Sequence, residues 1–243
     1  MREKMGSREE RDQVAAKVRR LRAGERGAVS DQEPFYTINR DKEKYLEKLL
    51  GYVAFLDYVK TLSSTVVLDV GAGTTRAISE IAKSKAGAGL DFKATVLNRN
   101  PAIEENLGFE NVHVTSVETL RGIADQSIGG IIAVFSLPYV VSPALAVTSI
   151  DRVLVPGGVI KAWLPSEDST DRKRVEKGTT YRSYKEFETE FKKLGYDCEY
   201  LERDGLELEV FLAIKPGGKL GGPSARELVS MDVQTRFDAK MNT

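Results

Sequence analysis

The order of apolar and polar residues divides the chain into alternating strand-like and helix-like segments from residue 65 onward. Short apolar runs bounded by glycine, proline or polar turns are typical of buried strands. The segments between them carry apolar residues at the three- and four-residue spacing of amphipathic helices. We therefore predict strands near 65–70, 94–98, 111–116, 129–135, 157–164, 197–203 and 207–214, and helices near 74–85, 101–107, 143–153 and 183–194.

Strands that alternate with helices through short connections predict an α/β fold. Such connections are right-handed crossovers, and they lead to a mostly parallel sheet. Gly205 lies between the last two strand runs and fits a hairpin at that point. Ser183 and Glu186 form a capping-box pair, which predicts the start of the last helix.

The two ends of the chain differ in pattern from this central part. Residues 1–33 are highly charged and rich in arginine, and we expect a solvated helical extension, with an RNA-contacting or partner-binding arm as the alternative. A second amphipathic helix is predicted over 41–60. Residues 216–243 begin with a glycine- and proline-rich linker and are expected to be a peripheral tail. The predicted domain is therefore 34–215.

Composition removes several classes of protein from consideration. The 243 residues are 41% apolar, and 36 basic residues balance 36 acidic ones, so no net field attracts nucleic acid or an anionic membrane. One cysteine, Cys198, and one histidine, His113, cannot build a His/Cys zinc site, and we expect no metal. The N-terminus is charged from Arg2, and the apolar run 130–141 is too short to span a bilayer. We expect a cytoplasmic protein with no membrane span.

The segment VVLDVGAGTTRAI at 66–78 carries the clearest chemical signal. An apolar strand ends at Asp69, and the spaced glycines Gly71 and Gly73 follow, which is how parallel α/β folds hold an adenosine-type cofactor. The third glycine of the dinucleotide motif is replaced by Arg76, so that motif fails. An acid two residues before the first glycine suits a cationic group better than a pyrophosphate. S-adenosylmethionine, which carries an amino group and a sulfonium but no phosphate, is the cofactor that fits.

Four further segments follow this one in a recognisable order. The five are LDVGAG (68–73), TSVETL (115–120), DQSIGGIIAVFSLPYV (125–140), DRVLVPGGVIKAWLP (151–165) and YRSYKEFETEFKKLGYDCEYLE (181–202). Together they resemble the class I S-adenosylmethionine-dependent methyltransferases, in particular the broad type-11-like group. The resemblance implies a Rossmann-like, doubly wound, mostly parallel seven-stranded sheet with an antiparallel last strand. It also implies methyl transfer from S-adenosylmethionine.

The resemblance assigns cofactor roles to residues at the ends of the first two strands. Asp69 would anchor the methionine part of the cofactor. Asn98 stands where the family has an acid that binds the ribose hydroxyls, and it offers one carbonyl oxygen without charge. Asp91 is the alternative ribose ligand, although it precedes the strand. Arg99 would stack on the adenine face.

The third and fourth strands complete the predicted cofactor site. Ser116 stands in place of the family's aspartate at the adenine amine, and Val117 would donate its backbone amide to the ring. Glu118 would substitute as the nearby acid, or else serve as a first-turn helix acid. The predicted cofactor-binding residues are Asp69, Gly71, Ala72, Gly73, Asn98, Arg99, Ser116, Val117, Glu118 and Phe135.

The methyl acceptor is expected where the fourth strand exits as PheSerLeuProTyr, 135–139. SLPY fits the type-11-like pattern, in which the segment lines the pocket. It also resembles the NLPY of the rRNA adenine dimethylases, with Ser136 in place of the asparagine. The polar connection 165–182 is a candidate substrate lid. The predicted pocket residues are Tyr36, Ser136, Pro138 and Tyr139.

These observations predict an enzyme that transfers a methyl group by in-line displacement. Alignment of the two reactants supplies much of such catalysis, so no acid–base pair is required and no catalytic residue is assigned. We expect a small-molecule acceptor. The alternatives are an RNA (adenine-type) or protein methyltransferase, and a non-catalytic binding or scaffold protein, which Asn98 and Ser116 would favour. The sequence leaves the oligomeric state open.

Overall fold

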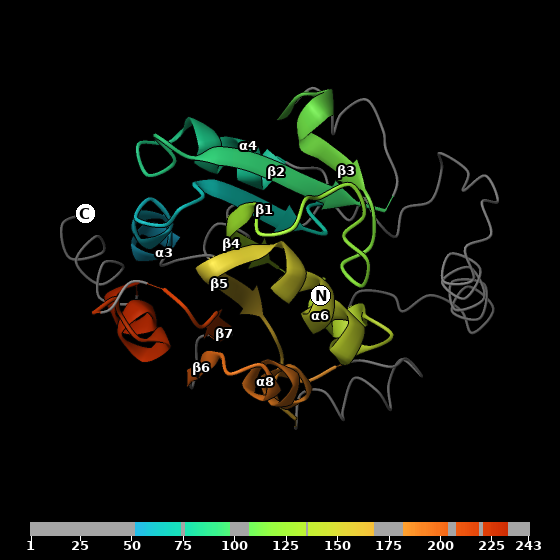
Figure 1. The fold of residues 1–243 in the computed structure, drawn as a ribbon, viewed down its shortest axis with the longest axis vertical. Coiled ribbons are helices and arrows are strands. Elements are labelled where there is room, and N and C mark those ends of the chain that lie inside the picture. Colours follow the sequence, from blue (N-terminus) through green and yellow to red (C-terminus); the bar gives the residue numbers. More distant parts are fainter. Residues whose placement is uncertain are drawn as a thin grey trace, which may run out of the picture.

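A seven-stranded sheet forms the centre of the molecule (Figure 1). The structure is a computed structural model, and it describes residues 52–73, 76–97, 107–134, 136–167, 182–203, 208–218 and 221–232. The strand order is β3-β2-β1-β4-β5-β7-β6. The strands are β1 (Val66–Val70), β2 (Asp91–Val96), β3 (Val112–Val114), β4 (Ile128–Ala133), β5 (Leu154–Trp163), β6 (Asp197–Arg203) and β7 (Leu208–Ile214).

The direction of each strand confirms the predicted doubly wound topology. β1 pairs in parallel with β2 and β4, and β2 with β3 and β4 with β5 are parallel as well. β7 runs antiparallel to both of its neighbours, β5 and β6. The chain order reverses between β1 and β4, and ligands of open α/β sheets bind at such a switch point, beyond the carboxyl ends of the strands.

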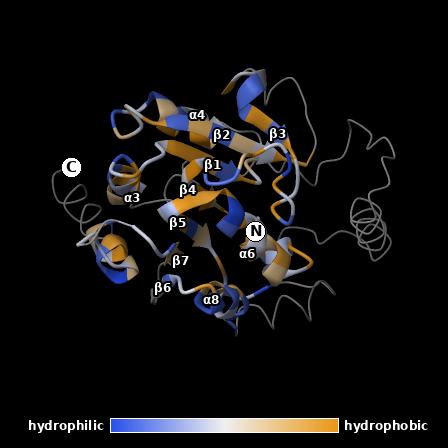
Figure 2. Cartoon of the chain, viewed as in Figure 1, coloured by the Kyte–Doolittle hydropathy of each residue, from blue (hydrophilic) through white to orange (hydrophobic). Residues whose placement is uncertain are grey.

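Helices cover both faces of the sheet. They are α3 (Tyr52–Val59), α4 (Arg76–Lys83), α6 (Pro143–Val153) and α8 (Tyr184–Lys193), with short 3-10 turns η1 (Phe109–Asn111) and η2 (Leu137–Tyr139). Alternate residues of the strands face opposite layers. On one face Leu68 packs with residues of α6 and α8, and on the other Val67 packs with α3 and α4. Figure 2 shows the hydrophobic colour concentrated on the central strands between these layers.

Glycine on β4 allows α3 to approach the sheet closely. A Cβ on Gly130 would lie 2.6 Å from Cγ2 of Val59 and 2.9 Å from the ring of Phe55, both on α3. Phe55 and Val59 have no exposed surface. The described end of the predicted 41–60 helix is thus confirmed as a buried element, and the part before Tyr52 lies outside the described residues.

Most predicted boundaries hold to within a few residues. The 143–153 helix is confirmed at both ends, and Glu186 accepts the Ser183 N–H at 2.9 Å as the capping-box pair predicts. β2 and β5 each begin three residues earlier than predicted. Among the described residues no helix is long and apolar enough to cross a membrane. Residues 1–51, most of 101–107, and 168–181 fall outside the described part, so the predictions made for them stay predictions.

The prediction of a wholly peripheral tail is wrong for residues 221–232. The helical stretch 225–232 buries Ala225, Leu228 and Val229 against the α3 face of the sheet. The buried carboxylate of Asp232 lies 2.7 Å from the Nζ atom of Lys161 on β5, and it accepts the Ala54 N–H at 2.8 Å. Removing one partner of a buried pair leaves an uncompensated charge, so this contact ties the tail to the core.

Candidate functional site

The carboxyl ends of four parallel strands bring the predicted site residues to one edge of the sheet. Asp69 on β1 is in register with Ala94 on β2 and Ile132 on β4. Ser116 follows β3, and Ser136 follows β4. Adjacent strands lie about 4.8 Å apart, so β1 and β3 are separated by roughly twice that spacing. An adenosyl group laid across this edge would reach from Asp69 to the β3 end.

The glycine bend after β1 has a backbone that other residues rarely adopt. Gly71 has φ +71° and Gly73 has φ +59°. A Cβ on Gly71 would lie 2.6 Å from the Cβ of Ser136, so the absence of a side chain is required for space as well as conformation. Thr95 on β2 holds the bend, because its Oγ1 accepts the Gly71 N–H and its carbonyl accepts the Ala72 N–H, both at 3.0 Å.

Asp69 is a buried carboxylate without a counter-charge in the described part of the chain. It is 7% exposed, and no hydrogen bond or ion pair joins its carboxylate to another described residue. Burial raises the pKa of the Asp69 carboxyl to about 7, because the charged form loses its hydration. A buried anion is costly unless it is paired. The carboxylate and the open bend beside it therefore fit a cationic nucleoside, whose amino group would supply the missing partner.

The segment after β3 has a free donor at the predicted adenine position. The Val117 N–H makes no hydrogen bond with any described residue, and the Val117 side chain is buried. Glu118 is committed elsewhere: its Oε1 accepts the N–H groups of Val141 at 2.7 Å and Ser142 at 2.9 Å. Ser116 accepts the Leu120 N–H at its carbonyl and stays half-buried.

The segment after β4 is the one predicted to contact the methyl acceptor. Its 3-10 turn η2 buries Leu137 and Pro138, whereas Tyr139 is 41% exposed. The hydroxyl of Ser136 is buried and has no hydrogen-bond partner among the described residues. The backbone carbonyls of the turn are already occupied, since those of Ser136 and Leu137 accept from Tyr139 and Val140.

Both described ends of the predicted lid close onto this acceptor segment or its neighbours. The Arg182 N–H donates to the Pro138 carbonyl at 2.9 Å, and its guanidinium donates to the Val140 carbonyl at 3.3 Å and to the Val141 carbonyl. The Tyr184 N–H donates to the Pro165 carbonyl at 3.0 Å. The Arg182 end of the 165–182 connection is therefore bonded to the segment after β4, whereas the Pro165 end is bonded to the start of α8, and the lid itself stays a prediction.

The structure separates the two candidates for the ribose. Asp91 is the first residue of β2 and is in register with Val66, the first residue of β1. It is exposed at the opposite edge of the sheet from the glycine bend, so it is excluded as a ribose ligand. Asn98 remains the prediction. Asn98 lies outside the described residues, as do Tyr36, Arg99 and Phe135.

Two functional candidates were missed by sequence reasoning. Thr95 is a buried threonine within a strand, and nothing in its local sequence distinguishes it from a packing residue. Arg182 ends a long polar connection that contains several other basic residues. In both cases the partners are 24 or more positions away in the chain, so only the tertiary structure brings them together.

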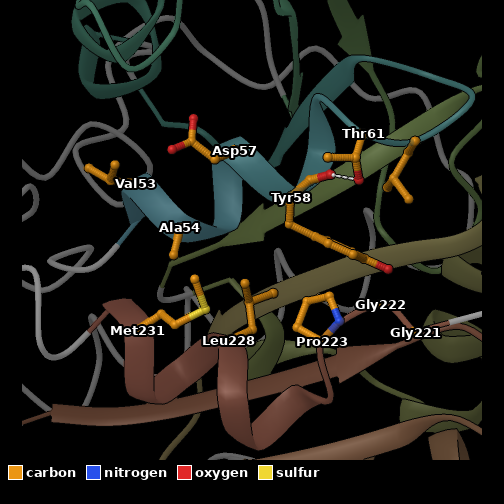
Figure 3. Close-up of a pocket in the computed structure, with 11 residues that line it drawn as sticks. Val53, Ala54, Asp57, Tyr58, Thr61, Gly221, Gly222, Pro223, Leu228 and Met231 are labelled. Carbon is orange, nitrogen blue, oxygen red and sulfur yellow. Dashed lines mark hydrogen bonds between the residues drawn. The ribbon is translucent and has the colours of Figure 1, made fainter. Parts of the chain in front are cut away.

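A separate groove lies between α3 and the C-terminal segment, away from this edge (Figure 3). It measures about 530 Å³, and Figure 3 shows Val53 and Ala54 on one side with Leu228 and Met231 on the other. The Tyr58 hydroxyl at the groove donates to the Gly157 carbonyl at 2.8 Å. No cluster of metal-ligating side chains occurs within the described ranges.

Comparison with known families agrees with this geometry. The family described as methyltransferase domain matches residues 62–205, which include the glycine bend, the β3 and β4 exits and α8. The chain belongs to this family. Its predicted class, the class I S-adenosylmethionine-dependent methyltransferases, is confirmed, and S-adenosylmethionine is the cofactor. No curated protein matches the sequence of this methyltransferase.

Solved structures share the fold at low sequence identity. The YcgJ protein of Bacillus subtilis is 13% identical with a TM-score of 0.52, over 69% of this chain and 99% of that one. The 1,6-didemethyltoxoflavin-N1-methyltransferase of Burkholderia thailandensis is 16% identical with a TM-score of 0.50, over 89% and 94%. The geranyl diphosphate C-methyltransferase of Streptomyces coelicolor is 11% identical with a TM-score of 0.50, over 67% and 74%.

Proposed function

We propose that this methyltransferase transfers the methyl group of S-adenosylmethionine to a small-molecule acceptor bound beside the exit of β4. The observation that carries the cofactor site is Asp69, a buried carboxylate with no counter-charge among the described residues, next to the open Gly71 bend. When bound, S-adenosylmethionine supplies a methyl group activated by its sulfonium. The chain's own contribution is to bind and orient.

Each cofactor residue is given a role that its geometry allows. Asp69 accepts from the amino group of the methionine part, and Gly71, Ala72 and Gly73 leave the backbone open to the ligand. Val117 donates its free N–H to the adenine ring, with Ser116 and Glu118 beside it. Asn98 and Arg99 keep their predicted contacts to the ribose and to the adenine, and Phe135 stays a predicted cofactor-binding residue; all three lie outside the described residues.

The acceptor side favours a small molecule over a nucleic-acid base. In the adenine dimethylase pattern an asparagine and a backbone carbonyl accept from the base amine. Here Ser136 replaces the asparagine, and the carbonyls of Ser136, Leu137 and Pro138 already accept internal N–H groups. Tyr139 presents an exposed ring for contact with a substrate, and Tyr36 and Pro138 are its predicted neighbours in the pocket. The Burkholderia thailandensis 1,6-didemethyltoxoflavin-N1-methyltransferase, which shares the fold over 89% of this chain, was solved with bound 1,6-didemethyltoxoflavin and S-adenosylhomocysteine.

Calorimetry with S-adenosylhomocysteine tests the cofactor site first. We expect saturable binding by the full chain. No binding at millimolar ligand would overturn the proposal that the protein is an S-adenosylmethionine-dependent enzyme. The second step is transfer of a labelled methyl group from S-adenosylmethionine into a fractionated cell extract.

The label identifies the acceptor class. We expect it in the low-molecular-mass fraction and insensitive to nuclease and protease. Label that disappears on ribonuclease treatment would replace the proposal with an RNA methyltransferase, and label in protease-sensitive material would replace it with a protein methyltransferase. Binding without any transfer would favour the non-catalytic alternative.

A further inference from the structure

The backbone of a single residue on the acceptor side, Val141, is held by opposite charges from two different parts of the chain. The Val141 N–H donates to the Glu118 carboxylate at 2.7 Å, and the Val141 carbonyl accepts from the Arg182 guanidinium. Glu118 belongs to the loop after β3, on the predicted adenine side, whereas Arg182 ends the 165–182 connection. Val141 therefore links the loop after β3 to Arg182 at the end of the 165–182 connection.

Further hydrogen bonds fix Glu118 on its side of this link. Glu118 also accepts the Ser142 N–H at 2.9 Å, and its own carbonyl accepts the Ser149 hydroxyl on α6 at 2.8 Å. Charge-assisted hydrogen bonds of this kind are about twice as strong as neutral ones. Glu118 is thus joined both to the two residues before α6 and to Ser149 within α6.

The guanidinium is fixed in turn by α8. The Arg182 Nη1 atom lies 3.0 Å from the Glu186 carboxylate, whose second oxygen caps the helix through the Ser183 N–H. With its backbone N–H on Pro138 and its side chain on Val140 and Val141, Arg182 contacts three carbonyls of one four-residue stretch. A fixed guanidinium fork is suited to hold several acceptors at once, which a flexible ammonium does less well.

We propose that Glu118 and Arg182 are positioning residues of the methyl-transfer site, which together hold segment 136–142 at a fixed place relative to the bound cofactor. This inference rests on the proposed function, because it assigns the segment to the acceptor. It differs from the predicted role of Glu118 as an adenine contact, since the carboxylate acts here through the Val141 and Ser142 amides. Ordering of the Glu118 loop by the cofactor is then transmitted to the acceptor side.

Hydrogen–deuterium exchange of the full chain, with and without saturating S-adenosylhomocysteine, tests this link. In the wild type we expect the ligand to slow exchange at least about threefold in peptides covering both 68–73 and 137–145. In Glu118→Ala the protection of 68–73 remains and that of 137–145 is lost. Glu118→Gln, whose amide oxygen still accepts both N–H groups, restores it. If Glu118 only stabilised the fold, S-adenosylhomocysteine would not change the hydrogen-exchange protection of 137–145 through it.

Arg182 is tested by separating binding from turnover. In Arg182→Ala we expect S-adenosylhomocysteine affinity within about threefold of wild type, and a kcat for labelled-methyl transfer into the acceptor fraction reduced at least tenfold. Arg182→Lys should recover part of this loss. Lys192→Ala, which breaks an exposed pair with Glu188 on the same helix, is the matched control and should behave as wild type.

The outcomes distinguish the positioning role of Glu118 and Arg182 from the proposed methyl-transfer function on which it rests. Wild-type protein that fails to bind S-adenosylhomocysteine overturns both. Wild-type protein that binds and transfers, with Glu118→Ala still protected at 137–145 or Arg182→Ala still transferring at the wild-type rate, overturns the inference alone. Equal losses of affinity and of turnover in Arg182→Ala would also overturn it, because they would place the residue in ligand binding.

Discussion

The cofactor side and the acceptor side of this sheet edge are built in different ways. On the cofactor side, a contiguous motif places a buried acid and a bare backbone bend within five residues, Asp69 to Gly73. On the acceptor side, an ordinary turn is held by charged side chains that lie 23 and 41 positions away from Val141. The first kind of site is specified locally, and the second depends on the assembled fold.

The difference has a physical consequence for how each side tolerates change. The bend is restricted by steric contacts and by a left-handed backbone. A substitution there therefore creates strain that neighbouring atoms cannot relieve by shifting. The acceptor turn keeps its own backbone bonds when a charged contact is removed, and it can shift without unfolding. Mutations of the bend should therefore abolish binding, whereas mutations of the acceptor side should alter positioning.

Gly71→Ala is expected to have the largest effect. A Cβ there meets the Cβ of Ser136 at 2.6 Å and imposes a side chain on φ +71°, so S-adenosylhomocysteine affinity should fall more than about 100-fold. Gly89→Ala is the matched control, because Gly89 has φ +79° with no atom within 4 Å of its Cβ. It should lower Tm slightly and leave affinity unchanged. Wild-type affinity in the Gly71 variant, measured by calorimetry, would show that the bend is not the binding element.

Asp69→Asn should reduce S-adenosylhomocysteine affinity by roughly 10- to 100-fold, because it removes one charge-assisted hydrogen bond. The wild type should also lose affinity as pH falls below about 7, because the carboxyl, whose pKa burial raises to about 7, becomes protonated and can no longer pair with a cation. The variant should bind weakly with little pH dependence. If affinity falls equally in the wild type and the variant as pH is lowered, the titrating group is not Asp69.

The same carboxyl predicts an opposite effect on stability. Because its pKa is raised in the folded state, Asp69 stabilises the unliganded protein fully below pH 3.8, and this contribution is lost as pH rises through about 7. Asp69→Asn removes the cost of the buried charge, so it should raise Tm at about pH 8 and raise it less at about pH 5, where the carboxyl ionises in the unfolded chain but not in the folded protein. A lower Tm at both values would contradict the unpaired carboxylate.

Thr95→Val tests the contact that holds the bend in place. It leaves the Gly71 N–H without the acceptor of a part-buried hydrogen bond, and an intramolecular hydrogen bond contributes about 0.5–1.5 kcal/mol net. We expect affinity to fall roughly 5- to 10-fold in calorimetry, with a modest loss of Tm. Thr95→Ser keeps the hydroxyl and should retain most of the affinity. If serine and valine behave alike, the methyl group of Thr95 matters rather than its hydroxyl.

Ser136→Ala should have the smallest effect. It removes a buried hydroxyl that has no partner, so the free energy of unfolding should stay the same or rise by up to about 1 kcal/mol. Denaturant unfolding of the unliganded protein measures this directly. A loss of unfolding free energy above about 1 kcal/mol would mean that the hydroxyl is hydrogen-bonded. The contrast between the cofactor side and the acceptor side would then be smaller.

Sequence reasoning was accurate where the signal was local and weaker where it was distant. The 143–153 helix, the alternation of strands and helices and the glycine bend follow from periodicity and turn chemistry, whereas the antiparallel last strand came from the family resemblance. The tail was misjudged because its apolar residues, such as Leu228 and Val229, gave only a weak pattern. The partner of its buried acid, Lys161, lies 71 positions earlier on a strand that otherwise reads as core.

The sequence by itself determined the alternation of strands and helices, the position of the Asp69–Gly73 motif and the family. These depend on residues within a few positions of one another, where side-chain periodicity and backbone sterics act directly. Tertiary structure alone decided that Asp69 is desolvated, that Thr95 holds the bend, and that Glu118 and Arg182 meet at Val141. Parallel register and helix packing set those contacts, because they join groups that lie far apart along the chain.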